Sequence, residues 1–87
     1  MKIALKIVIF QEEDVYVALA PEINVSSFGD TIKEAEESIK EAIELFFEEC
    51  QRMGTLEQVL EEAGFLQDGD SWQPRKPVAE EELSLAI

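Results

Sequence analysis

Between residues 26 and 35 the chain reads Ser26-Ser27-Phe28-Gly29-Asp30-Thr31-Ile32-Lys33-Glu34-Ala35 and changes its pattern of apolar residues. Before this segment, apolar residues alternate with a period of two, as in strands that bury one face. After it they recur every three or four residues, as on one face of a helix. The switch predicts a small sheet that runs directly into an amphipathic helix.

Three strands are predicted before the helix. The first spans residues 2–10 and has apolar residues on both faces, so both faces are candidates for burial. An acidic turn of hairpin length, Gln11–Asp14, follows it. The second strand spans residues 15–20 and ends at Pro21, because proline has no N–H to donate to a sheet. A shorter third strand is predicted over Asn24–Phe28.

The helix is predicted over Thr31–Met53. Thr31 and Glu34 have the spacing of a capping box, which favours a helix start at Thr31. The apolar residues that follow form one continuous stripe, which indicates a core-facing surface rather than a cofactor site. Its members are Ile32, Ala35, Ile39, Ala42, Ile43, Phe46, Phe47 and Cys50.

A second, shorter helix is predicted after Gly54, which closes the first one. Thr55 and Gln58 have the spacing of another capping box, and Gly64 lies where a helix commonly ends in the left-handed conformation. From Gln67 onward the character of the chain changes. Asp68-Gly69-Asp70 is typical of a turn, and the prolines at positions 74 and 77 favour an extended chain.

The last residues alternate again, with Leu83, Leu85 and Ile87 separated by smaller side chains. This pattern predicts a late strand over Glu81–Ile87, and a frayed acidic tail is the alternative. We therefore divide the chain into a β-β-β-α-α domain, residues 1–66, and an extended tail, residues 67–87. The tail belongs either to the same domain or to an oligomer interface.

Composition restricts the functions that the chain can have. Eighty-seven residues make one domain, and 20 acidic residues against 7 basic ones give a net charge of −13. This charge disfavours direct binding of nucleic acid, and it suits either a basic protein partner or simply a soluble surface. The small size favours self-association, as a dimer or a tetramer. Residues 1–10 are too short to span a membrane, so we expect a cytoplasmic protein.

The sequence also lacks the residues of most catalytic sites. It has no histidine, no nucleophile paired with a base and no phosphate-binding glycine loop, so we expect neither an enzyme nor a cofactor. Asp68-Gly69-Asp70 lacks the spacing of a calcium loop, and we expect no metal site. The single cysteine, Cys50, excludes an internal disulfide and is predicted to be a buried, inert thiol on the helix stripe.

The order of short motifs in the first half of the chain resembles the N-terminal domain of HicB-like antitoxins, the protein partners of HicA-type mRNA-cutting toxins. These motifs are Tyr16-Val17-Ala18, Pro21, Gly29-Asp30-Thr31, Glu34-Ala35 and Ile39-Lys40-Glu41-Ala42-Ile43. The resemblance covers Lys2 to Phe65 and continues through Trp72 as the short form of the family. The DNA-binding module that often follows this domain is missing, so unaided operator binding is not expected.

This resemblance, with the periodicity, predicts an α+β fold of the order β-β-β-α-α-β. A three-stranded antiparallel β-meander packs on a long α-helix, followed by a short second helix and a late C-terminal strand. The family fold is related in outline to part of RNase H. The first two predicted strands hold no acidic residue, however, so the carboxylates that two-metal nuclease chemistry needs are not in place.

The resemblance implies an antitoxin that binds and neutralises a small basic HicA-type toxin. A stand-alone oligomeric structural or regulatory module without a toxin partner is the main alternative, and an RNase H-like hydrolase is the third. Electrostatic complementarity makes acidic residues of the hairpin and the outer helix face the candidate contacts with a basic toxin. They are Glu12, Glu13, Asp14, Glu22, Glu37, Glu41, Glu44, Glu48 and Glu49.

Overall fold

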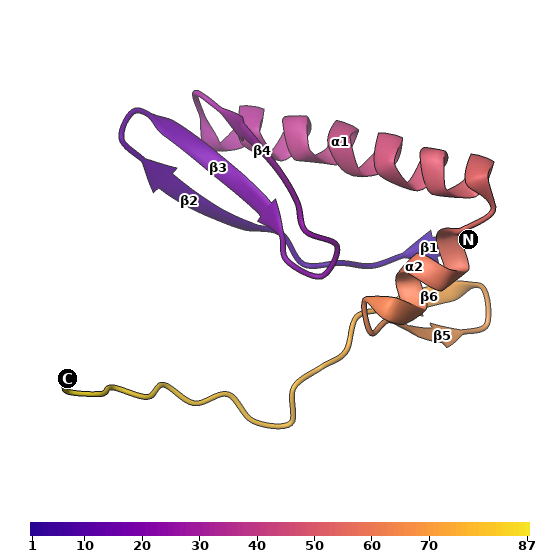
Figure 1. Ribbon diagram of the computed structural model, residues 1–87. Coiled ribbons are helices and arrows are strands. Elements are labelled where there is room, and N and C mark those ends of the chain that lie inside the picture. The colour runs from indigo at the N-terminus through magenta and orange to yellow at the C-terminus, as the bar shows by residue number, and fades with distance from the viewer.

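A computed structural model describes all 87 residues of the chain and shows the predicted α+β fold (Figure 1). The long helix α1 extends along both halves of the molecule, with one small sheet at each end. The elements in chain order are β1 (Lys2–Ile3), β2 (Val8–Glu12), β3 (Val15–Ala20), β4 (Val25–Gly29), α1 (Ile32–Met53), α2 (Leu56–Glu62), β5 (Leu66–Asp68) and β6 (Ser71–Gln73).

The predicted antiparallel meander is confirmed as β2-β3-β4. Ala18 and Ala20 of β3 are fully buried together with Ala35 and Ile39 of α1, so these alanines mark the inner face of the sheet. Because side chains alternate along a strand, Val17 and Leu19 point to the outer face. The helix therefore covers one side of the meander, and it packs on β4 and β3.

The prediction of a single first strand over residues 2–10 is wrong in one respect. The segment forms two short strands, and β1 belongs to a different sheet from β2. Residues Lys2 and Ile3 pair in parallel with Ser71 and Trp72 of β6, whereas β2 pairs only with β3. The hairpin turn is also tighter than predicted, because β2 continues to Glu12 and only Glu13 and Asp14 connect it to β3.

The long helix begins and ends as the sequence predicts. Thr31 Oγ1 accepts a hydrogen bond from Glu34 N–H at 3.0 Å, and Glu34 Oε2 accepts one from Asp30 N–H at 2.9 Å. At the other end Gly54 has a φ of 72°, and its N–H donates to the Gln51 carbonyl at 3.1 Å. The N–H of the next residue, Thr55, donates to the Cys50 carbonyl, which completes a Schellman motif.

The predicted second capping box is wrong. Thr55 makes no side-chain bond to the first turn of α2, and its hydroxyl is directed at the Cys50 carbonyl instead, at 3.4 Å. The reason is that Thr55 also completes the end of α1, so its position is set by the preceding helix. The predicted end of α2 is confirmed, because Gly64 follows it with a φ of 89°.

A late strand exists, but not where the alternation of the last residues predicts it. Residues 81–87 form no strand, and the late strand is β6, which forms a hairpin with β5 around Asp68–Ser71. Trp72 of β6 is only 2% exposed, and it closes a second core with Cys50, Leu56, Leu60 and Phe65. The burial of Trp72 thus fixes β6, whereas the end of the chain has no core to join.

The two cores are linked by α1, which contributes Ile39 and Ile43 to the first core and Cys50 to the second. Phe47 packs against both cores. The predicted burial of Cys50 is confirmed, with 6% of its surface exposed. Neither helix is both long enough and apolar enough to cross a membrane.

Candidate protein interface

The outer face of the β2–β4 sheet is apolar and uncovered. A sheet that packs on one side usually carries polar side chains on the other. Here the register places Phe10, Val17 and Phe28 in one row across the three strands. Phe10 is 55% exposed and Phe28 is 68% exposed. We name this surface the outer sheet face, and it comprises Val8, Phe10, Val15, Val17, Leu19 and Phe28.

Three acidic residues border the outer sheet face at the β2–β3 turn. Glu12 lies on the same face as Phe10, because it is two positions further along β2, and it pairs with Val15. Glu13 and Asp14 form the turn that follows. All three are exposed, and none takes part in an ion pair of the chain. Their charges are therefore free to attract a basic partner toward the apolar surface beside them.

The predicted helix acids lie elsewhere. Glu37, Glu41, Glu44 and Glu48 are exposed and follow one another at three- and four-residue steps, so they form a stripe along α1. Glu44, at the edge of this stripe, also lines an open groove between the helix and the strand side. Since α1 covers the inner face, this stripe and the outer sheet face lie on opposite sides of the molecule. A small partner cannot contact both at once.

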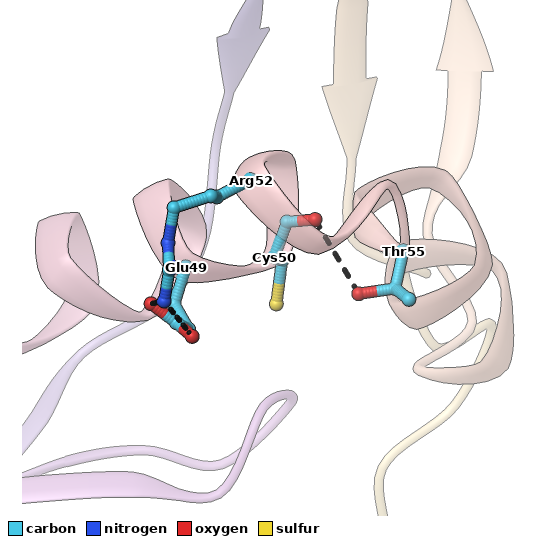
Figure 2. Close-up of polar contacts among 4 residues, drawn as sticks. All are labelled: Glu49, Cys50, Arg52 and Thr55. Carbon is cyan, nitrogen blue, oxygen red and sulfur yellow. Dashed lines mark hydrogen bonds and ion pairs between the residues drawn. The ribbon is translucent and has the colours of Figure 1, made fainter.

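Two of the helix acids are already paired with neighbouring bases. Glu44 lies 4.0 Å from Lys40, and the Glu49 carboxylate accepts hydrogen bonds from the Arg52 guanidinium, which bends back one turn to reach it (Figure 2). Exposed pairs of this kind add little to stability. They do lower the net charge that the helix presents, whereas the three carboxylates of the hairpin turn have no basic partner.

Glu22 is the most isolated of the predicted contact residues. It lies in the turn between β3 and β4, at the opposite end of the meander from Glu13. One of its carboxylate oxygens, Oε2, is buried and has no hydrogen-bond partner. The side chain lines a pocket of about 480 Å³ with Lys6, Glu62 and Arg75. Glu22 is thus half-buried among charged neighbours and is not part of the acidic border of the outer sheet face.

The structure thus divides the predicted contact residues into three separate groups, and Glu12, Glu13 and Asp14 are the group that adjoins the outer sheet face. The candidate contacts predicted from the sequence did not include the exposed Phe10 and Phe28. The signal was present, because Phe10 and Phe28 occupy strand positions that alternate with those facing the helix. To see that both side chains share one exposed face, one must know how the strands pair, and the sequence does not provide the pairing.

Side chains that could hold a metal ion are not gathered at any point. No three His, Cys, Asp or Glu side chains come together as a group that could hold a metal ion. The sequence placed Glu12 in a turn, whereas the structure places it on β2, but it points to the outer face, away from the helix. The Cys50 side chain is buried in the second core, and the exposed Glu49–Arg52 pair lies nearby on the same helix (Figure 2).

Comparison of the chain with known protein families, with curated proteins and with solved structures finds no match.

Proposed function

We propose that this chain is a HicB-like antitoxin, a protein that binds a small basic HicA-type mRNA interferase and covers its RNA-cutting surface. The observation that carries the proposal is the outer sheet face, an exposed apolar surface with unpaired carboxylates at its border. The family identity of the partner rests on the sequence motifs described above. No reaction is assigned to the chain itself.

The physical argument starts from the toxin. A surface that holds RNA must attract phosphates, so it carries lysine or arginine side chains. Carboxylates at the border of the outer sheet face complement such a surface and speed the encounter. The exposed phenylalanines then supply the desolvated centre on which affinity commonly depends, since aromatic anchors dominate many interfaces. A chain with a charge of −13 competes with RNA for the same basic groups.

The test starts from the gene neighbourhood, where we expect an adjacent reading frame for a small basic protein, and continues with co-expression of that protein and this chain. We expect the two proteins to co-purify, and we expect this chain to restore growth and to stop RNA cleavage by the partner. Purified alone, this chain should neither cleave RNA in the presence of Mg²⁺ or Mn²⁺ nor shift DNA. Failure of the neighbour both to co-purify and to lose toxicity would contradict the antitoxin proposal. A stand-alone oligomeric module would then be the better interpretation.

A pair of charge-matched variants locates the interface. The first changes the hairpin border, with Glu12→Gln, Glu13→Gln and Asp14→Asn. The second changes the α1 stripe by the same net charge, with Glu41→Gln, Glu44→Gln and Glu48→Gln. Both lose three negative charges, so they weaken long-range attraction alike. We expect the dissociation constant, measured by titration calorimetry, to rise about tenfold or more for the hairpin variant and much less for the α1 variant.

The apolar part of the surface is tested in the same assay. Phe10→Ser combined with Phe28→Ser should abolish measurable binding, because it removes both exposed aromatic anchors. Leu45→Ser is the control, since Leu45 is 65% exposed on α1 and is not part of the outer sheet face. If the α1 variants weaken binding as much as those on the sheet, the contact is on the helix and the outer sheet face has another role.

A further inference from the structure

A groove remains open between α1 and β2. The helix packs on β4 and β3, and it leaves the inner side chains of the first residues of the meander only partly covered. The groove has a volume of about 420 Å³, and its apolar wall consists of Leu5, Ile7 and Ile9 from the strand side and Ile39 and Ile43 from the helix. Three charged residues of α1, Glu36, Lys40 and Glu44, also line it. The groove is an open side of the first core, and no element of the same chain covers it.

The strand beside this groove also has a free edge. In the sheet order β2-β3-β4, the backbone of β2 pairs with β3 on one side only. An unpaired edge of this kind offers N–H and C=O groups to another strand. A strand added there would lie beside Ile9, with Ile7 just before the start of β2, and every second side chain of it would point toward the groove.

The end of the chain has the pattern of such a strand. Leu83, Leu85 and Ile87 alternate with Ser84 and Ala86, and no strand, helix or core includes them. Leu83 is 79% exposed and Leu85 is 75% exposed. Figure 1 shows this tail leaving β6 as an extended segment that ends away from both sheets. Three apolar side chains with a period of two are thus left without a partner.

The tail of the same chain is badly placed to fill its own groove. β6 runs parallel to β1, with Ser71 opposite Lys2. If the tail continued in this register, Leu83 would lie opposite Asp14, beyond Glu12 at the end of β2. An extended tail therefore carries its apolar residues past the groove, and only a reversal of the chain would bring them back. The tail of a second copy is not restricted by this register, so its apolar residues can reach the groove.

We propose that residues 83–87 of a second copy of this chain pair with the free edge of β2 and place Leu83, Leu85 and Ile87 in the groove. The exchange is reciprocal, because the second copy has the same groove and the same tail. Each first core is thus completed by side chains of the other chain, in a two-fold dimer. The outer sheet face stays exposed in this dimer, so the proposal does not depend on the proposed function.

The direct test is the mass of the purified full-length chain at micromolar concentrations, by sedimentation equilibrium. We expect a dimer for the natural sequence. The variant Leu83→Ser, Leu85→Ser, Ile87→Ser should raise the dimer dissociation constant about tenfold or more. Its matched control is Ser84→Ala with Ala86→Ser, which changes the other face of the same segment and should leave the dimer intact. All these residues lie outside both cores, so the variants should fold normally.

A monomeric natural chain, or a dimer that the Leu83, Leu85 and Ile87 substitutions leave unchanged, would overturn the proposal. Salt supplies a second readout. Each copy carries a charge of −13, so screening of the repulsion should tighten an apolar contact as salt rises. A dimer that weakens with salt would point to charged contacts and would also overturn it. Binding of a basic toxin should respond to salt in the opposite direction, so the two proposals fail independently.

Crosslinking distinguishes a second copy from the chain's own tail. Chains with Ile7→Cys are mixed with chains with Leu85→Cys and oxidised, while the buried Cys50 is left in place. We expect a covalent dimer of one chain of each kind. A chain that carries both substitutions should also crosslink to its neighbour at concentrations where the dimer forms. An internal crosslink in a monomer would show the tail folding back on its own groove and would overturn the exchange.

Discussion

On the inner face of the β2–β4 sheet, Ala18 and Ala20 are fully buried beneath α1, whereas on the outer face Phe10 and Phe28 expose more than half of their surface. The small side chains thus lie where the helix must approach, and the large ones lie where nothing covers them. Folding explains the inner face, because small residues let the helix come close. It does not explain the outer one, since an uncovered sheet face is ordinarily polar. The proposed function requires such a difference, since it assigns the outer face to a partner.

The largest effect should come from opening the inner face. Ile39 is 2% exposed in the centre of the first core, so Ile39→Ala should lower the free energy of unfolding by about 2–5 kcal/mol. Urea denaturation followed by circular dichroism measures this. Leu45→Ala on the same helix is the control, and it should cost less than about 1 kcal/mol because Leu45 is exposed. Equal losses would mean that α1 does not hold the inner face as described.

Neighbouring residues of β4 give a second, smaller test of the same contrast. Gly29 faces α1, and a Cβ added to it would come within 2.5 Å of the Ala35 backbone nitrogen. Gly29→Ala should therefore force the helix away and lower the free energy of unfolding by about 1–3 kcal/mol. Phe28→Ser, one residue earlier on the outer face, should change it by only about 1 kcal/mol. Thermal unfolding of the two variants measures both losses. If Phe28→Ser lowered the free energy of unfolding more than Gly29→Ala, the assignment of the inner and outer faces would be wrong.

The inner face was also the part that the sequence predicted best. The alternation around Ala18 and the start of the helix at Thr31 depend on neighbours close in the chain, so local patterns suffice. The division of residues 2–10 into β1 and β2 was missed because it depends on β6, which is distant in sequence. A local pattern shows that a segment can be a strand but not which strand it meets.

The late strand shows the same limit, because here the local pattern predicts a strand that does not form. Residues 81–87 have the stronger alternation, yet the strand forms at Ser71–Gln73, because Trp72 fills a core there. For the candidate site, the sequence supplied the acidic residues of the hairpin as a prediction, together with six other acidic residues. It could not separate them from Glu22 or from the α1 stripe, since that separation exists only after the sheet and helix are packed. Phe10 and Phe28 were missed for the same reason.

The predicted N-terminal caps of the two helices, Thr31 and Thr55, provide a further test. Thr31 determines where α1 begins, and α1 is the helix that covers the inner face. Thr31 accepts the Glu34 N–H, so Thr31→Ala should lower the free energy of unfolding by about 1 kcal/mol. Thr55 has no such bond to α2. Thr55→Ala should thus cost less than Thr31→Ala, as measured by urea denaturation of both variants. A larger loss at Thr55 would indicate that the closure of α1, and not its start, limits stability.

The smallest effect is expected at the β2–β3 turn, at one end of the meander. Glu13 has a φ of 54°, a left-handed conformation that costs an L-residue about 1–2 kcal/mol. Glycine removes this strain but adds roughly 0.5–1 kcal/mol of entropy to the unfolded chain. Glu13→Gly should therefore raise the free energy of unfolding by less than about 1 kcal/mol. The turn before β4 supports this reasoning, since its left-handed residue is Asn24, a type that tolerates the conformation better.

Asp14→Gly is the matched control for Glu13→Gly, because Asp14 is next in the turn and does not have a positive φ. It should lower stability slightly, since glycine there relieves no strain and still makes the unfolded chain more flexible. Each variant removes one carboxylate from the border of the outer sheet face. Both should slow association with a basic partner by a similar factor in stopped-flow measurements, although their effects on stability have opposite signs. If association instead followed stability, the border would act through the fold of the hairpin and not through its charge.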